Sequence, residues 1–140
     1  MRPFLILMML ICYSSVKAQD IALFNKDGKA TAYIDTKDED RTIYLYSGEP
    51  VAFLSEADVY GFNGKHLGWY EKGIIRDHKG DKIGATKKAS TGYTQYEPYK
   101  SYKQRKPYIG HKSYPPYKPY FYSSWTDSSF ETFLLQGIEK

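Results

Sequence analysis

Four glycines, each in a turn signal, constrain the fold of this chain more than any other feature of its sequence. They are Gly28, Gly48, Gly64 and Gly80, of which the last three are sixteen residues apart, and a polar insertion at 36–40 lengthens the first gap. Neighbours such as Asn63 tolerate the positive φ that tight hairpin turns require. One isolated hairpin is marginal in water, so four similar hairpins are expected to pack on one another.

The residues after each glycine repeat as well. The third position holds Thr31, Val51, Leu67 and Ile83. The fourth holds residues with almost no side chain, namely Ala32, Ala52, Gly68 and Gly84. The fifth holds Tyr33, Phe53, Trp69 and Ala85. Because alternate strand residues face opposite sides, we expect the third and fifth positions on one face and the small residues on the other.

The sequence therefore predicts a mainly β fold of four consecutive β-hairpins packed with approximate four-fold pseudosymmetry. A low-complexity tail and a short C-terminal helix complete the prediction. The same hairpin pattern also fits an ordinary meander or a small barrel, and the pattern alone leaves these alternatives open.

The hairpin region from Ile21 to about Thr86 resembles the four-fold β-flower domain, a family of exported bacterial proteins. The similarity lies in Ala22 to Ala30, Gly61 to Tyr70 and Gly80 to Gly84. These are turn and packing residues, so the resemblance implies a fold and no established activity. The fourth copy, at 73–88, matches least well, which leaves its pairing least constrained by the pattern.

The tail from Gly92 onward has a period of three. Tyrosines keep one phase, at Tyr93, Tyr96, Tyr99, Tyr102, Tyr108, Tyr114, Tyr117 and Tyr120. Lysines fall one position later, at Lys100, Lys103, Lys106, Lys112 and Lys118. Three residues per turn is the repeat of polyproline II, in which tyrosines and lysines would form two separate edges. The alternative is a disordered, solvated tail whose triplets record composition only.

The last residues predict a short amphipathic helix at 127–137. Ser128 and Glu131 have the spacing of a capping box, and Gly137 is placed to end the helix. Phe130, Phe133 and Leu134 form an apolar stripe. A helix this short needs a surface to pack on, which we expect to be the β domain. A helix that binds a partner is the alternative.

The first eighteen residues have the pattern of a cleavable signal peptide. Arg2 precedes the apolar run 4–11, and Val16-Lys17-Ala18 fits the small-x-small rule for cleavage before Gln19. The run is shorter than the about 20 residues of a membrane span, which disfavours an uncleaved anchor. Cys12, the only cysteine, follows Ile11 rather than the small residue of a lipoprotein signal. Export to the periplasm or the exterior of a bacterium is therefore expected.

The mature chain then divides into a four-hairpin domain at 19–91, the tail at 92–126 and the helix. Acidic residues are in slight excess in the hairpin domain and basic residues in the tail. The net charge is too small to indicate nucleic-acid binding. His66, His78 and His111 lie in or beside turns and in the tail, without metal-ligand spacing, and we expect them to be surface histidines. We accordingly expect no metal, cofactor or catalytic residue.

The function that these features favour is a non-catalytic envelope module, binding or structural. The Tyr/Lys tail is its candidate contact surface, for envelope polysaccharide or another envelope protein. The alternative is a small envelope enzyme with a pocket formed by the hairpin turns. That alternative requires Asn25, Asn63, His66, Asp77 or His78 to converge.

Overall fold

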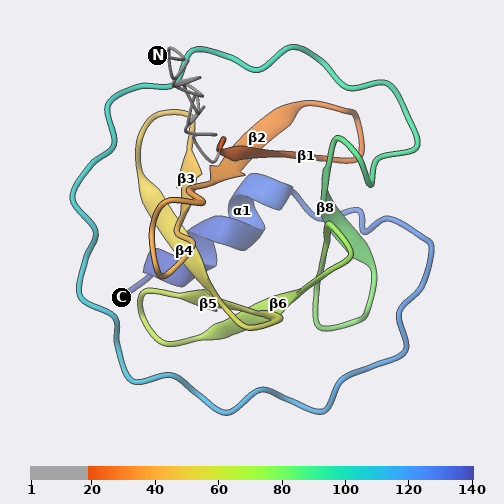
Figure 1. Ribbon diagram of the computed structural model, residues 1–140. Coiled ribbons are helices and arrows are strands. Elements are labelled where there is room, and N and C mark those ends of the chain that lie inside the picture. The colour runs from red at the N-terminus through yellow and green to blue at the C-terminus, as the bar shows by residue number, and fades with distance from the viewer. Residues whose placement is uncertain (1–18) are drawn as a thin grey trace, which may run out of the picture.

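The computed structural model describes residues 19–140, which form a closed antiparallel barrel of eight strands in chain order. The strands are β1 (Ile21–Phe24), β2 (Ala30–Ile34), β3 (Ile43–Leu45), β4 (Pro50–Ser55), β5 (Asp58–Gly61), β6 (His66–Glu71), β7 (Ile74–Arg76) and β8 (Lys82–Thr86). Figure 1 shows the four hairpins arranged like petals around a central helix. The predicted four-hairpin architecture is confirmed, and it closes as a barrel.

Each petal is one hairpin: β1–β2, β3–β4, β5–β6 or β7–β8. The four turn glycines all have positive φ, from +77° to +93°. The fourth hairpin, least constrained by the sequence pattern, is complete, with Ile75 opposite Gly84 and Arg76 opposite Lys82. Four seams, β2–β3, β4–β5, β6–β7 and β1–β8, join the petals.

A β-bulge in every petal corrects the expected division of side chains between the two faces. In the second petal Ile43 pairs with Ala52 and Tyr44 with Pro50, so Val51 is the extra residue. A bulge turns two consecutive residues to the same side. Val51 and Ala52 therefore both lie in the inner core, whereas Phe53 packs in a separate outer cluster. The prediction that the third and fifth positions share a face is wrong.

The C-terminal segment fills the centre of the barrel. Helix α1 (Phe130–Leu135) continues into a 3₁₀ turn, η1 (Gln136–Ile138). Phe130, Phe133 and Leu134 are buried and belong to the inner core. The N-cap is Ser129, whose side chain accepts a hydrogen bond from the Thr132 N–H, rather than the predicted Ser128.

The small residues of the repeat give this helix its room. A Cβ atom built at Gly84 would lie 2.5 Å from Cζ of Phe130, and one at Gly68 would lie 3.3 Å from Cζ of Phe133. Gly137 lies inside η1 instead of ending the helix, and its Cα would be 2.1 Å from a Cβ at Gly61. The ring of Phe130 therefore explains Gly84, and the carbonyl oxygen of Arg76, 1.9 Å from a Cβ at Gly68, explains Gly68. Close approach of two backbones explains Gly61 and Gly137.

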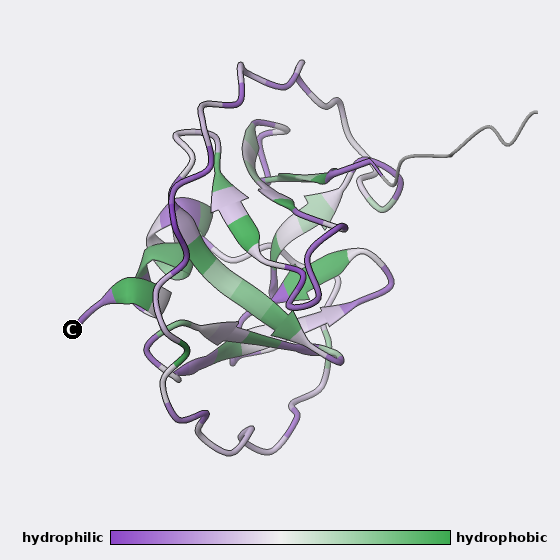
Figure 2. Cartoon of the chain, turned by 60° about the vertical axis from the view of Figure 1, so that its left-hand side comes forward, coloured by the Kyte–Doolittle hydropathy of each residue, from purple (hydrophilic) through white to green (hydrophobic). Residues whose placement is uncertain are grey.

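The tail runs around the outside of the petals before it enters the barrel. In Figure 1 it follows the first petal, then the second, third and fourth, and then leads into α1. Figure 2 shows apolar strands and helix inside this outer, more polar strip of chain. None of the helices in residues 19–140 is long and apolar enough to cross a membrane. The predicted signal peptide lies outside the described residues.

Candidate functional site

The segment 93–122, called the belt here, is attached to the petals with a period of nine residues. The N–H groups of Gln95, Gln104, Ser113 and Tyr122 donate to the carbonyl oxygens of Gly28, Gly48, Gly64 and Gly80, at distances of 2.8 to 3.1 Å. Two further N–H groups, of Ser101 and Gly110, donate to Tyr46 and Phe62. The belt therefore runs nine residues, or three of its triplets, from one petal to the next. The alternative of a solvated tail does not describe this arrangement.

The turn glycines are required for this attachment as well as for the turns. A Cβ at Gly48 would lie 2.0 Å from the carbonyl oxygen of Tyr102, and the other three turn glycines meet Tyr93, His111 and Tyr120 at 2.0 to 2.1 Å. Any side chain at these positions would push the belt away. Glycine is therefore the residue that can both adopt the left-handed backbone conformation and leave room for the belt carbonyl.

The lysines of the belt point toward the barrel. Lys103 Nζ lies 3.0 Å from Asp35 Oδ2, and Lys106 Nζ lies 2.9 Å from Asp38 Oδ2. Lys118 pairs with Glu71, and Lys100 Nζ lies 3.4 Å from Asp20 Oδ2. Lys112 reaches Ser55, with its Nζ 3.2 Å from the hydroxyl oxygen. The sequence places lysines beside tyrosines on the contact surface, whereas the structure uses the lysine edge to hold the belt.

The Lys106–Asp38 pair is ionised, because the pKa shifts of both side chains favour their charged forms. The hydrogen bond to Asp38 raises the pKa of Lys106. Burial opposes ionisation of Asp38, but hydrogen bonds from Thr42 and Lys106 outweigh it and lower the pKa of that carboxyl. Both side chains keep some solvent exposure, so the pair contributes modestly, at most about 1 kcal/mol.

Aromatic residues of the barrel form a layer beneath the belt. Tyr33 stacks on Tyr44 with ring centroids 5.7 Å apart, and Phe53 stacks on Tyr60 at 6.0 Å. Lys100 Nζ lies 4.7 Å from the centroid of the Tyr33 ring, within cation–π range. The repeat aromatics therefore have a structural role in attaching the belt.

The tyrosines of the belt point away from the barrel. Tyr93, Tyr96, Tyr99, Tyr102, Tyr108, Tyr114, Tyr117 and Tyr120 are between 74 % and 98 % exposed. The belt passes all four petals (Figure 1), so these rings surround the molecule. Exposed aromatic rings in this number leave much apolar surface in water, which is typical of a contact surface. The structure keeps them in place by attaching their backbone.

A cluster of ionisable side chains that the sequence did not predict lies between the third and fourth petals. The buried His66 has Nε2 2.9 Å from Asp58 Oδ1 and Nδ1 3.0 Å from Nε2 of His78. The carboxylate requires a proton on His66 Nε2, so a neutral His66 accepts from His78. Partial desolvation, with the neighbouring His66, lowers the pKa of His78.

The assignment of His66 to a surface turn is wrong, because its ring packs edge-on against Tyr60 and Trp69. His78 and His111 are exposed as expected. A signal for His78 did exist. It occupies the second position before the turn glycine, where the second and third copies have the aromatic residues Tyr46 and Phe62. The position of His78 in the repeat, rather than its spacing from other histidines, would have predicted that it lies in the aromatic layer beneath the belt.

The residues required by the enzyme alternative converge in part. Asn63, His66 and His78 line one cleft, together with His111 and Ser113 of the belt. Asn25 lines a different cleft. Asp77 instead accepts hydrogen bonds from the backbone of its own turn, at Lys79 and Asp81. Residues 19–140 contain no group of three or more His, Cys, Asp or Glu side chains placed to hold a metal ion.

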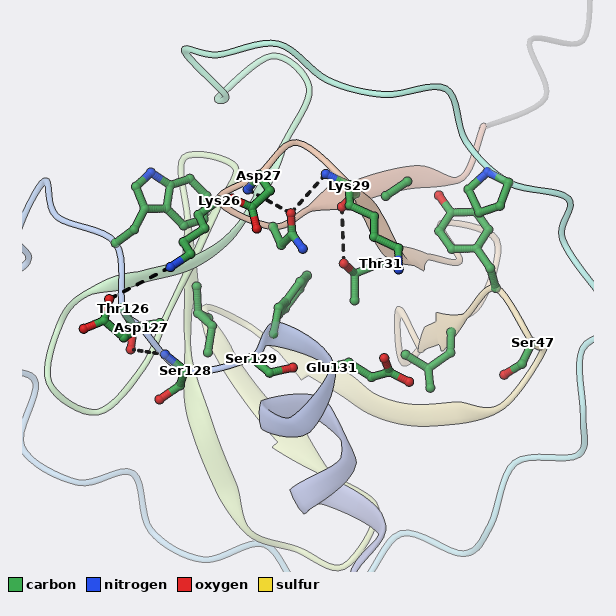
Figure 3. A pocket seen from close by; sticks show the side chains of 18 residues that line it. Lys26, Asp27, Lys29, Thr31, Ser47, Thr126, Asp127, Ser128, Ser129 and Glu131 are labelled. Atoms are coloured by element: carbon green, nitrogen blue, oxygen red, sulfur yellow. Dashed lines mark hydrogen bonds and ion pairs between the residues drawn. The ribbon is translucent and has the colours of Figure 1, made fainter.

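The cleft that Asn25 lines, shown in Figure 3, lies where the chain enters the barrel at α1 and has a volume of about 520 Å³. Its charged groups come from the first turn, from the segment before the helix and, at Glu131, from α1 itself. Lys26 and Asp127 are 3.9 Å apart, and Trp125 lies beneath the ammonium of Lys82. The cleft therefore combines charges of both signs, with an aromatic face already in contact with a cation.

Comparison with known protein families matches residues 21–134 to the family described as 4-fold beta flower protein. Neither the curated proteins nor the solved structures contain a significant match. The matched range includes the four hairpins, the whole belt and most of α1, so the similarity to the family extends over the tail as well as the hairpins. The chain belongs to the 4-fold beta flower protein family.

Proposed function

We propose that this protein is a non-catalytic module of the bacterial envelope, exported by its signal peptide, that binds through the tyrosines of the belt. The observation that carries the proposal is that eight belt tyrosines are 74 % to 98 % exposed although the belt itself is fixed. A fixed backbone removes part of the entropy that binding by a flexible tail would cost. The periplasm or the cell exterior is the corresponding location.

Envelope polysaccharide is the proposed partner. A tyrosine ring presents an apolar face to a sugar ring and a hydroxyl group for hydrogen bonding. Rings distributed around the belt can each make a weak contact, and repeated contacts along one polymer add through multivalency. A second envelope protein that presents a repetitive surface would be held in the same way.

The test is binding of isolated envelope polysaccharide to the purified protein. The triple variant Tyr108→Ser, Tyr114→Ser and Tyr117→Ser should weaken binding at least about tenfold, because aromatic stacking contributes roughly 0.5–1.5 kcal/mol per ring. The matched control Gln104→Ser with Ile109→Ser changes exposed belt residues without removing a tyrosine, and it should bind like the unaltered protein. Equal binding by all three proteins would exclude the belt tyrosines as the contact surface.

A small enzyme is the alternative, favoured only by the cleft that His66 and His78 line together. There the carboxylate of Asp58 would orient His66, which in turn would orient His78 as a general base. This alternative predicts a turnover that His78→Gln abolishes and that the tyrosine variants leave unchanged. The proposed binding function predicts the reverse dependence for polysaccharide binding.

A further inference from the structure

The β1–β8 seam is the shortest of the four seams between petals. Only Leu23 and Phe24 of β1 pair with β8, opposite Thr86 and Ala85. Ile21 and Ala22 pair with β2 alone. β8 ends at Thr86, whose carbonyl oxygen then accepts the N–H groups of Ala89 and Ser90 as the chain turns away. The barrel surface therefore opens along the outer edge of β1.

Two adjoining clefts follow this open seam, with volumes of about 650 Å³ and 590 Å³. They adjoin because the same three residues, Ile21, Thr86 and Lys88, line both. Tyr93 and Tyr96, at the start of the belt, line the first cleft, and Tyr70 lines the second. Together the two clefts form a groove, called the seam groove here, with tyrosines at both ends.

The charge of the seam groove is positive and uncompensated. Lys87 and Lys88 line the first cleft, and Lys72 lines the second. Within residues 19–140 none of these three ammonium groups lies within 4.0 Å of a carboxylate, in contrast to four lysines of the belt. The two carboxylates of the groove are already engaged by other groups. Asp20 contacts Lys100 and Lys103, and Glu97 accepts a hydrogen bond from Tyr46.

We propose that the seam groove binds an anionic oligosaccharide, such as one that contains uronic acids. Its carboxylates would pair with Lys72, Lys87 and Lys88, while its sugar rings pack on Tyr93 and Tyr96. This inference rests on the proposed polysaccharide-binding function, and it adds that the saccharide is anionic and binds in the seam groove. An added peptide strand fits less well, because the unpaired edge of β1 consists of two residues.

The test is calorimetric titration of the purified protein with a short uronate oligosaccharide, a neutral oligosaccharide of equal length, inorganic phosphate, and vesicles of an anionic phospholipid. The double variant Lys87→Ser, Lys88→Ser removes two cations of the groove. Its control, Lys37→Ser with Lys79→Ser, removes two exposed lysines that line neither cleft. The groove variant should lose about tenfold in affinity for the uronate, the scale of losing charge-assisted hydrogen bonds, and the control should lose little.

Each result decides the inference. Uronate binding that weakens in the groove variant and stays in the control supports it. Equal losses in both variants would mean a response to net charge and would overturn it, as would groove-dependent binding of vesicles or phosphate without uronate binding. Uronate binding that depends on Tyr108, Tyr114 and Tyr117 but not on the groove lysines would overturn the groove and leave the proposed function standing. Binding of no saccharide by any variant would overturn both.

Discussion

At the scale of single residues, four glycines connect the barrel to the belt. Each has the positive φ of its turn, and each lies against a belt carbonyl where no Cβ fits. Their carbonyl oxygens then accept the N–H groups of the belt. The repeat that determines the hairpins in the sequence therefore determines the attachment of the belt as well.

Gly48→Ala should lower the stability by about 2 kcal/mol, which combines the cost of a side chain at positive φ with the loss of one hydrogen bond. A loss of this size corresponds to a fall of roughly 5–10 °C in the thermal midpoint. Gly92→Ala is the control, because nothing lies within 4 Å of a Cβ at that position. A Gly48→Ala midpoint equal to that of the control would contradict the contact with Tyr102.

The repeat positions could be recognised from the sequence, but the face of the barrel on which each side chain lies could not. The small residues and the aromatics recur with the turn glycine, and this recurrence predicts four alike hairpins. The division between inner and outer faces was wrong because a bulge, such as the one at Val51, leaves no mark in a pattern read by strict alternation. The contact of His66 with His78 also requires the geometry of two adjacent petals.

At the scale of elements, the belt has a fixed course although it contains no helix and no strand. Three triplets span each petal, so tyrosines recur with one outward phase while every third triplet meets a turn glycine. The period of three was visible in the sequence. The period of nine was not, because it depends on the distance between petals around the barrel, which side-chain identity does not report.

One alanine inserted after Arg105 should destabilise the protein. It moves Ser113 and Tyr122 out of register with the carbonyl oxygens of Gly64 and Gly80, which puts about 2 kcal/mol of hydrogen bonding at risk. One alanine inserted after Thr91, where Gly92 has no close contact, is the matched control. Thermal unfolding of the two insertion variants measures the difference. Equal midpoints would show that stability does not depend on the alignment of the belt with the petals.

The His66–His78 contact links two petals and should make stability depend on pH. The folded state lowers the pKa of His78, so the unfolded state binds more protons as the pH falls below about 6.5. Stability is therefore fully present above that pH and declines below it.

Denaturant titrations between about pH 7.5 and pH 5.5 measure this dependence, in a range where ordinary histidines titrate. His78→Gln keeps an N–H donor for His66 but cannot take up the proton, so it should flatten the slope. The exposed His111→Gln should leave the slope unchanged. If stability still declined with falling pH in His78→Gln, the proton taken up on unfolding would belong to another group.

At the scale of the whole molecule, the strands of the barrel come first along the chain, and the later segments cover the barrel outside and fill it inside. The belt covers the outer aromatic layer, and α1 fills the centre with Phe130, Phe133 and Leu134. The excess of acidic residues in 19–91 and of basic residues in the tail gives the two parts complementary charge. Sequence patterns predicted the four packed hairpins and the amphipathic helix, whereas the closure of the barrel and its enclosure by the belt arise from contacts between residues distant in the chain.

The measurement that tests this account most directly is amide hydrogen exchange along the belt, resolved by residue. The amides that donate to the petals should be protected, and they are Gln95, Ser101, Gln104, Gly110, Ser113 and Tyr122. The amides of the exposed tyrosines between them, such as Tyr99, Tyr108 and Tyr117, should exchange far faster. Protection that recurs with the period of nine residues is the predicted result. Exchange of every belt amide at the rate of an unfolded peptide would contradict the account.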